Sequence, residues 1–222
     1  MPAGTESEEL KMIAATRTLL LWLVFALVFT TPVWADDDDY LEGAQYQELP
    51  LAPAPLQDGR VEVVEFFFYG CPHCHSFEPY LEEWLKTNAD NVAFTRVPAI
   101  FNGRWEALAR AYYTAEILGV MDKIHTPLFD AIHKDHKNIF GQEAIREFFV
   151  AHGVSAEDFD NTFSSFAVHN KIRQARQLQQ RYRIQGVPTM VIGGHYVTNA
   201  TMAGSHTEAV KVTNYLIKKE KG

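Results

Sequence analysis

The two cysteines of this 222-residue sequence lie three positions apart, in a Cys-Pro-His-Cys motif at residues 71–74. The motif follows residues 61–68, a run rich in β-branched and aromatic residues that is apolar on both faces. Such a run is typical of a strand buried on both sides, in a sheet that helices cover. After the motif, apolar residues recur at helical spacing, at Phe77, Leu81, Trp84 and Leu85. Both cysteines are therefore expected where a buried strand meets a helix.

The remaining periodicity predicts a helical block between two α/β segments. Residues 91–97 are expected to form a strand, and residues 189–197 a hairpin with the pair Gly193-Gly194 as its two-residue turn. A last helix over residues 205–219 opens with the Ser-x-x-Glu pattern of a capping box. Between the strand and the hairpin only helices are predicted, at residues 105–118, 121–133, 142–152 and 157–182.

This order of elements predicts the fold class α/β, with an all-helical insertion. We assign residues 61–100 and 184–222 to the α/β domain and residues 101–183 to the insertion. Residues 36–60, which contain three prolines, are interpreted as an irregular lead-in.

Composition excludes several classes of protein. The formal net charge is −8, and no block of five or more Lys or Arg occurs, so a nucleic-acid-binding function is not expected. Two cysteines are too few to staple a small disulfide-framework fold. The hydrophobic fraction of 47% is enough for a packed core and excludes wholesale disorder.

The N-terminal segment is typical of a signal peptide. The uninterrupted apolar run at residues 19–29 is too short to span a bilayer as a helix, and Arg17 gives it a positive flank. Residues 1–35 are therefore interpreted as a signal peptide that is cleaved after Ala35, with export as the consequence. Because three glutamates precede Met12, we interpret Met12 as the true start. An uncleaved membrane anchor is the open alternative.

The position of the cysteines favours redox chemistry. A disulfide across two residues removes little entropy from the unfolded chain, so a purely structural role is poorly motivated. At a helix N-terminus, unpaired N–H groups and partial positive charge stabilise a thiolate at Cys71, and His73 can add a positive charge or a hydrogen bond. A stabilised thiolate favours the reduced form, which makes the corresponding disulfide a strong oxidant.

Half of a zinc site is the strongest alternative for the motif. Structural zinc usually takes four Cys or His ligands, and the sequence has no second cysteine pair. His73 and His75 are close in sequence, and His133 and His136 could add ligands. The last two lie in a stretch rich in Lys, Asp and Asn, which we interpret as a solvated helix end. We therefore expect no metal.

Together with residues 186–189, Gly-Val-Pro-Thr at the start of a strand, the motif resembles the thioredoxin superfamily. With the helical block between them, the chain resembles the DsbA family of bacterial periplasmic disulfide oxidases over nearly the whole mature length. The resemblance implies that Cys71 is the exposed attacking cysteine and Cys74 its buried partner, with Pro72 and His73 as supporting residues of the motif. It also implies that Pro188 is a cis-proline facing the motif; an ordinary trans turn proline is the alternative.

The resemblance also draws attention to Glu65, a carboxylate in the apolar strand before the motif, where burial is costly. The family carries an acidic residue here, paired with a basic residue on the next strand, and Arg96 occupies the corresponding place. We hypothesise that Glu65 moves protons at Cys74. The alternative is a strand-end charge that reaches solvent. For Glu78, a role in tuning the motif and a place on the helix surface stay equally open.

The function that the resemblance implies is oxidation of thiols in newly translocated, unfolded proteins by a periplasmic enzyme without a cofactor. Substrates would bind through an apolar groove and through backbone pairing near Val187 and Pro188. A DsbB-like, quinone-linked membrane protein would reoxidise the enzyme, which we expect to be a monomer. The alternatives are a disulfide isomerase or reductase, for which residues 36–60 are too short to form a dimerisation domain, and a non-enzymatic chaperone or metal-binding module.

Overall fold

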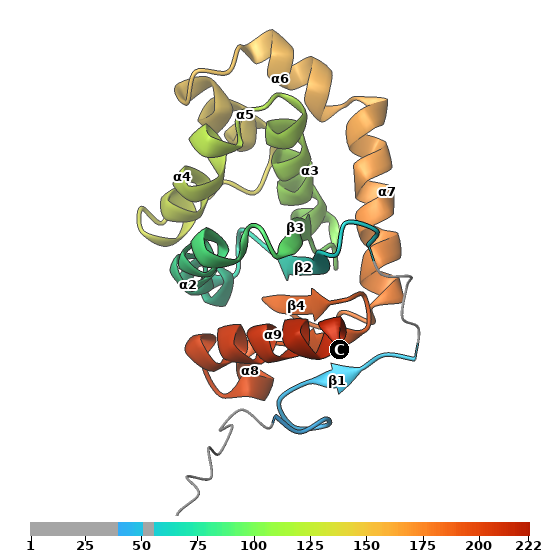
Figure 1. The fold of residues 1–222 in the computed structure, drawn as a ribbon. Helices are drawn as coiled ribbons and strands as arrows, with labels where there is room; N and C mark the ends of the chain where they lie inside the picture. The colour runs from blue at the N-terminus through green and yellow to red at the C-terminus, as the bar shows by residue number, and fades with distance from the viewer. Residues whose placement is uncertain (1–39, 51–55) are drawn as a thin grey trace, which may run out of the picture. The chain divides into compact units, whose positions relative to one another are not determined.

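A mixed five-stranded sheet forms the centre of the part of the chain that the computed structural model describes, residues 40–50 and 56–222. Its strand order is β1-β5-β4-β2-β3. Strands β1, β4, β2 and β3 are labelled in Figure 1. The strands are β1 (Gln47–Glu48), β2 (Val61–Phe67), β3 (Val92–Pro98), β4 (Thr189–Ile192) and β5 (Tyr196–Thr198). The predicted signal peptide and its cleavage site lie outside the described residues, as do residues 51–55 of the lead-in.

Strand β2 is central and buried on both sides, as its composition predicts. It runs parallel to β3 and antiparallel to β4, so that Glu65 lies opposite Arg96 on one side and Met190 on the other. Val64 and Phe66 belong to one hydrophobic cluster, and Val61 and Val63 to another. The alternation of side chains along a strand explains how one short segment supplies both cores.

Two helices cover one face of the sheet. Helix α2 (Pro72–Asn88) follows the Cys-Pro-His-Cys motif, and α9 (His206–Lys221) ends the chain. Leu81 of α2 and Leu216 of α9 are fully buried in the same hydrophobic cluster as Val63 of β2. This packing holds the middle of α2 against the sheet.

The segment between β3 and β4 is helical, as predicted. It consists of α3 (Gly103–Ile117), α4 (Met121–His133), α5 (Gln142–Ala151), α6 (Ala156–Phe163) and α7 (Phe166–Arg181). The prediction of one long helix over residues 157–182 was wrong. The helix is interrupted between α6 and α7. There the Ser165 hydroxyl accepts a hydrogen bond from the backbone N–H of Val168, 3.2 Å away, and so caps a new helix.

The hairpin and the last helix differ from their predictions in detail. Ile192 pairs with Tyr196, so the connection has three residues rather than two, and both of its glycines have positive φ. The short helix α8 (Ala200–Ala203) was not predicted. Ser205 caps α9 by accepting from the N–H of Glu208. The Glu208 carboxylate accepts from Tyr40 and Lys211, so the only capping-box contact seen is the serine half.

Residues 40–222 form one compact unit by their contacts. The expected boundaries of the helical insertion, at residues 101 and 183, therefore stay a prediction. No helix in the described part of the chain is long and apolar enough to cross a membrane.

Candidate redox site

The two cysteines occupy different environments on the first turn of α2. Cys71 is the N-cap residue and is partly exposed, whereas Cys74 is fully buried. The backbone N–H of Cys71 donates to the carbonyl of Phe68 (2.9 Å), and its carbonyl accepts from the N–H of His75 (3.1 Å). Pro72 stands at the first helical position, where the missing N–H costs nothing. The end of β2 and the start of α2 thus place one sulfur at the surface and one inside.

These environments separate the acidities of the two thiols. The pKa of Cys71 is lowered to about 6, first by a hydrogen bond from the Cys74 side chain and then by backbone N–H groups of the helix start and the charge of His73, against the opposing effect of burial. Burial raises the pKa of Cys74 well above its ordinary value. At neutral pH the site therefore holds a thiolate at Cys71 and a thiol at Cys74. Sequence reasoning named the helix start and His73, but it missed the contribution of Cys74.

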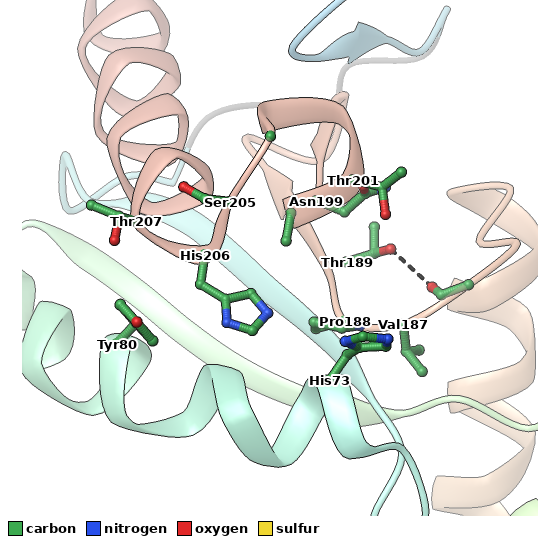
Figure 2. Close-up of a pocket in the computed structure, with 13 residues that line it drawn as sticks. His73, Tyr80, Val187, Pro188, Thr189, Asn199, Thr201, Ser205, His206 and Thr207 are labelled. Carbon is green, nitrogen blue, oxygen red and sulfur yellow. Dashed lines mark hydrogen bonds between the residues drawn. The ribbon is translucent and has the colours of Figure 1, made fainter.

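The loop before β4 lies against the motif. The Cys71 Sγ lies 3.6 Å from the carbonyl oxygen of Val187, which accepts a hydrogen bond from the thiol when Cys71 is protonated. The Val187–Pro188 peptide bond is cis. Thr189 begins β4, and its hydroxyl donates to the carbonyl of Gly186 (2.9 Å; Figure 2). The fold thus brings together the two segments that carry the motif and the distant proline, 116 residues apart at Cys71 and Val187.

A groove of about 560 Å³ runs beside these residues. In Figure 2, His206 extends from the start of α9 toward α2, and His73 lies next to Val187 and Pro188. The sequence predicted apolar contacts here. Apolar groups of Val187, Pro188 and Ala200 line the groove, together with imidazole, amide and hydroxyl groups from His73, His206, Asn199, Thr201, Ser205 and Thr207.

A buried cluster of charges lies beneath the motif. Glu65 is 0% exposed, and its Oε2 accepts from Arg96 Nε at 3.1 Å. A second Arg96 nitrogen donates to Glu78 Oε2 at 2.9 Å. Both open alternatives are therefore excluded: Glu65 does not reach solvent, and Glu78 is not a surface residue of α2, because it too is buried.

The two carboxyl groups that share Arg96 have opposite pKa shifts. Burial, followed by the negative charge of Glu78, raises the pKa of Glu65 to about 8 against the effect of Arg96. Burial also acts to raise the pKa of Glu78, but His125 and Arg96 outweigh it and the pKa is lowered. Glu65 thus holds a proton at neutral pH while Glu78 is ionised. In its ionised form, Glu65 also raises the pKa of the Cys74 thiol.

Sequence reasoning missed a set of aromatic and histidine residues around the motif. The Tyr69 hydroxyl lies 2.8 Å from Nδ1 of His125. The backbone carbonyl of Tyr69 accepts a hydrogen bond from Nε2 of His133 at 2.7 Å. The ring of His133 also stacks on that of His75, with centroids 5.0 Å apart. His133 is the last residue of α4, as the interpretation of a helix end requires, but it is only partly exposed, whereas His136 is exposed.

His75 has a partner of its own. Its Nε2 lies 2.9 Å from Oδ1 of Asp130. No group of three or more His, Cys, Asp or Glu side chains arranged to hold a metal occurs among the residues that the structure describes.

Comparison with known proteins gives the family. The sequence model of the DSBA-like thioredoxin domain matches residues 94–209. The thiol:disulfide interchange protein DsbA of Pseudomonas aeruginosa is 39% identical over 206 residues, which cover 92% of this chain and 97% of that protein. This chain belongs to the DsbA family. The DsbA of Azotobacter vinelandii is 41% identical over 179 residues, covering 81% of this chain and 84% of that protein.

Solved structures of DsbA proteins agree with this fold. The crystal structure of Pseudomonas aeruginosa DsbA matches with a TM-score of 0.77 at 41% identity, covering 83% of this chain and 96% of that one. The DsbA oxidoreductase of Xylella fastidiosa matches with a TM-score of 0.75 at 36% identity, covering 82% and 98%. The predicted thioredoxin-like fold with a helical insertion is confirmed. As a member of the DsbA family, the chain is a thiol:disulfide oxidoreductase that catalyses disulfide formation in substrate proteins.

Proposed function

We propose that this protein donates a Cys71–Cys74 disulfide to newly exported proteins. The observation that supports this direction of transfer is the asymmetry of the two thiols. A thiolate at Cys71, with a pKa of about 6, stabilises the reduced form of the pair. Stabilising the reduced form raises the reduction potential, so the disulfide tends to oxidise other thiols.

The reaction takes two exchange steps. A substrate thiolate attacks Cys71 Sγ, a mixed disulfide forms, and the bond to Cys74 breaks with Cys74 leaving as a thiolate. A second substrate thiolate then attacks the substrate sulfur of the mixed disulfide, and Cys71 leaves as a thiolate. The substrate loses two electrons and gains a disulfide, while the enzyme becomes the dithiol. The low pKa of Cys71 favours the second step, because a more acidic thiol is a better leaving group.

In this mechanism Glu65 supplies the proton that Cys74 needs. The thiolate released inside the protein is costly, since burial raises the pKa of Cys74 well above its ordinary value. Glu65 holds a proton at neutral pH, and once it is ionised its negative charge raises the pKa of Cys74. Arg96 stabilises the carboxylate that remains, at 3.1 Å from Glu65 Oε2.

Substrates bind, on this proposal, across Val187 and Pro188. The Val187 carbonyl lies next to the Cys71 sulfur, where an extended peptide can pair with the loop backbone while its cysteine reaches Cys71. The mixed lining of the groove suits varied side chains rather than one sequence.

The setting of the reaction follows from the resemblance. The protein acts in the periplasm after a signal peptide over residues 1–35 is removed behind Ala35, and a DsbB-like, quinone-linked membrane protein reoxidises it. The redox site belongs to a domain of residues 61–100 and 184–222, and residues 101–183 form the insertion. The enzyme acts as a monomer without a metal or an organic cofactor.

Equilibration with glutathione tests the proposal, with the Cys71 thiolate titrated by its ultraviolet absorbance. We expect a strongly oxidising pair and a Cys71 pKa well below the ordinary value of about 8.5. Cys71→Ser should abolish oxidation of a reduced, unfolded substrate, and excess chelator should leave oxidation unchanged. An ordinary Cys71 pKa would rule out the strong oxidant. Suppression of substrate aggregation that survives Cys71→Ser would indicate a chaperone, and loss of activity in chelator would indicate a metal-binding module.

A further inference from the structure

His125 of α4 connects the residues on either side of the Cys-Pro-His-Cys motif. It is buried, and its Nδ1 lies 2.8 Å from the hydroxyl of Tyr69, two residues before Cys71. Its Nε2 lies 3.4 Å from Oε2 of Glu78, one helical turn after Cys74, within range of a charge interaction but without the geometry of a hydrogen bond. A side chain from the helical insertion therefore contacts both the strand that enters the motif and the helix that leaves it.

The contacts indicate where the proton of a neutral His125 ring resides. Burial raises the pKa of Tyr69 well above its ordinary value, so its hydroxyl stays protonated and can donate to Nδ1. A neutral imidazole that accepts at Nδ1 carries its proton on Nε2, and this atom faces the Glu78 carboxylate. His125 thus presents an N–H group to an anion.

The other groups around His125 do not compete for this N–H. From α3, Tyr112 faces the imidazole with ring centroids 6.1 Å apart, and burial raises the pKa of its phenol, so it too is uncharged at neutral pH. Phe67 of β2 and Phe129 of α4 complete the surroundings with apolar rings. Glu78 is the anion at contact distance, and Arg96 lies on the far side of its carboxylate.

The state of Glu78 determines the state of Glu65. Arg96 donates one nitrogen to each carboxyl group, so the two compete for one cation. An N–H group from His125 favours the ionised form of Glu78, and an ionised Glu78 disfavours ionisation of Glu65. The pair therefore keeps its single proton on the carboxyl group that acts on Cys74.

We propose that His125 is a positioning residue for the redox reaction, which holds Glu78 as the carboxylate partner of Arg96 and thereby keeps the shared proton on Glu65. This inference rests on the proposed role of Glu65 as the proton donor to Cys74. It gives the helical insertion a direct part in the chemistry of the motif, through one imidazole.

Two substitutions separate the contacts of His125. Asparagine places its amide near the position of Nδ1, so His125→Asn can keep the contact with Tyr69 but is too short to reach Glu78. Glutamine places its amide near the position of Nε2, so His125→Gln can still direct an N–H group at Glu78. His133→Asn is the matched control. His133 lies on the same helix, and its Nε2 binds the backbone carbonyl of Tyr69 rather than the carboxylate of Glu65 or Glu78.

The measurement is the pH dependence of the glutathione equilibrium from about pH 6 to about pH 9. A titration midpoint that the wild-type pH profile shows and the Glu65→Gln profile lacks is assigned to Glu65. We expect His125→Asn to lower this midpoint by about one pH unit, a tenfold change in the dissociation constant, because Glu78 then takes up a proton more readily. His125→Gln and His133→Asn should keep the wild-type midpoint. In a Glu78→Gln background, His125→Asn should cause no further shift.

The outcomes separate this inference from the proposed function. An unshifted midpoint in His125→Asn, or an equal shift in His133→Asn, overturns the role of His125 alone. A wild-type profile without a Glu65-dependent midpoint overturns the role of Glu65 as well. Nitrogen NMR of the wild-type ring needs no substitution and covers the case in which His125→Asn fails to fold. A neutral ring protonated at Nε2 supports the proposal, and one protonated at Nδ1 overturns it.

Discussion

The thiol of Cys74 is the largest influence that lowers the pKa of Cys71. It acts as a hydrogen-bond donor to the thiolate, and hydrogen bonds to charged groups are the stronger class. The same thiol is fully buried, so it remains protonated under conditions in which Cys71 is ionised. Each cysteine thus sets the protonation state of the other.

Replacing Cys74 tests this dependence. Cys74→Ala removes the donor, and we expect the pKa of Cys71 to rise by about one unit or more, since one unit corresponds to about 1.4 kcal/mol. Cys74→Ser keeps a hydroxyl donor at the same place and should keep the pKa low. Absorbance of the thiolate against pH measures both. A Cys71 pKa in Cys74→Ala that stays as low as in the wild type would show that the helix start and His73 are sufficient.

The raised pKa of Glu65 leads to a separate prediction about how the rate of disulfide transfer depends on pH. Its pKa is raised to about 8, so the carboxyl group holds its proton below that pH and loses it above. Glu65→Gln removes the transferable proton while keeping the shape of the side chain. We expect disulfide transfer to a peptide thiol to slow by a factor of roughly 10². The rate of the variant should also lose the inflection near this pH in stopped-flow measurements, and an unchanged rate and potential would contradict the proton-donor role.

At the scale of elements, the turn between β2 and α2 leaves little room. A Cβ added to Gly70 would lie 2.5 Å from the ring of Phe68 and 2.9 Å from that of Phe140. The Phe68 ring stacks on Trp105 with centroids 3.8 Å apart, so it cannot readily swing away. Trp105 belongs to α3, so the insertion packs against the strand and the turn that position Cys71.

The break between α6 and α7 depends on a single hydroxyl. Ser165→Ala removes the acceptor for the N–H of Val168, and we expect a loss of about 1 kcal/mol in the free energy of unfolding. The control is Ser164→Ala, one residue earlier and exposed, which should change stability by less than about 0.5 kcal/mol. Urea unfolding of the two variants measures the difference, and equal effects would mean that Ser165 contributes nothing as a cap.

At the scale of the described chain, the redox site is assembled from distant segments. Cys71 comes from the start of α2, Val187 from the loop before β4, and His125 from α4 of the insertion. The charged cluster beneath the motif adds Arg96 from β3. Unfolding separates these segments, so the low pKa of Cys71 is a property of the folded protein and contributes to its stability.

This linkage predicts the pH dependence of stability. The pKa of Cys71 is about 6 in the folded dithiol and near the ordinary value of about 8.5 in an unfolded chain, so its stabilising contribution is complete above the unfolded value and is lost as the pH falls through 6. The disulfide form has no such group. Relative to the oxidised protein, the reduced protein should therefore melt at a higher temperature at about pH 8 than at about pH 5. Scanning calorimetry of both forms measures the difference, which a pH-independent gap would contradict.

Local sequence patterns were sufficient for most of the fold. The double-sided burial of β2, the helix that follows the motif and the helical nature of residues 101–183 are encoded by hydrophobic periodicity. Errors occurred where one polar side chain or one residue of register decides the outcome. Ser165 divides a continuous helical pattern, and the pairing of Ile192 with Tyr196 adds a third residue to the glycine turn.

The sequence by itself determined the chemistry of this protein, because the spacing of Cys71 and Cys74 at a strand-to-helix junction is a local property. It also pointed to Glu65, through the cost of a carboxylate in an apolar strand. Only the tertiary structure decided what surrounds them. Tyr69 and His125 are 56 residues apart, and their contact exists because α4 packs against the strand and helix that flank the motif. Burial and hydrogen bonding between distant segments set the pKa values, and no local pattern encodes them.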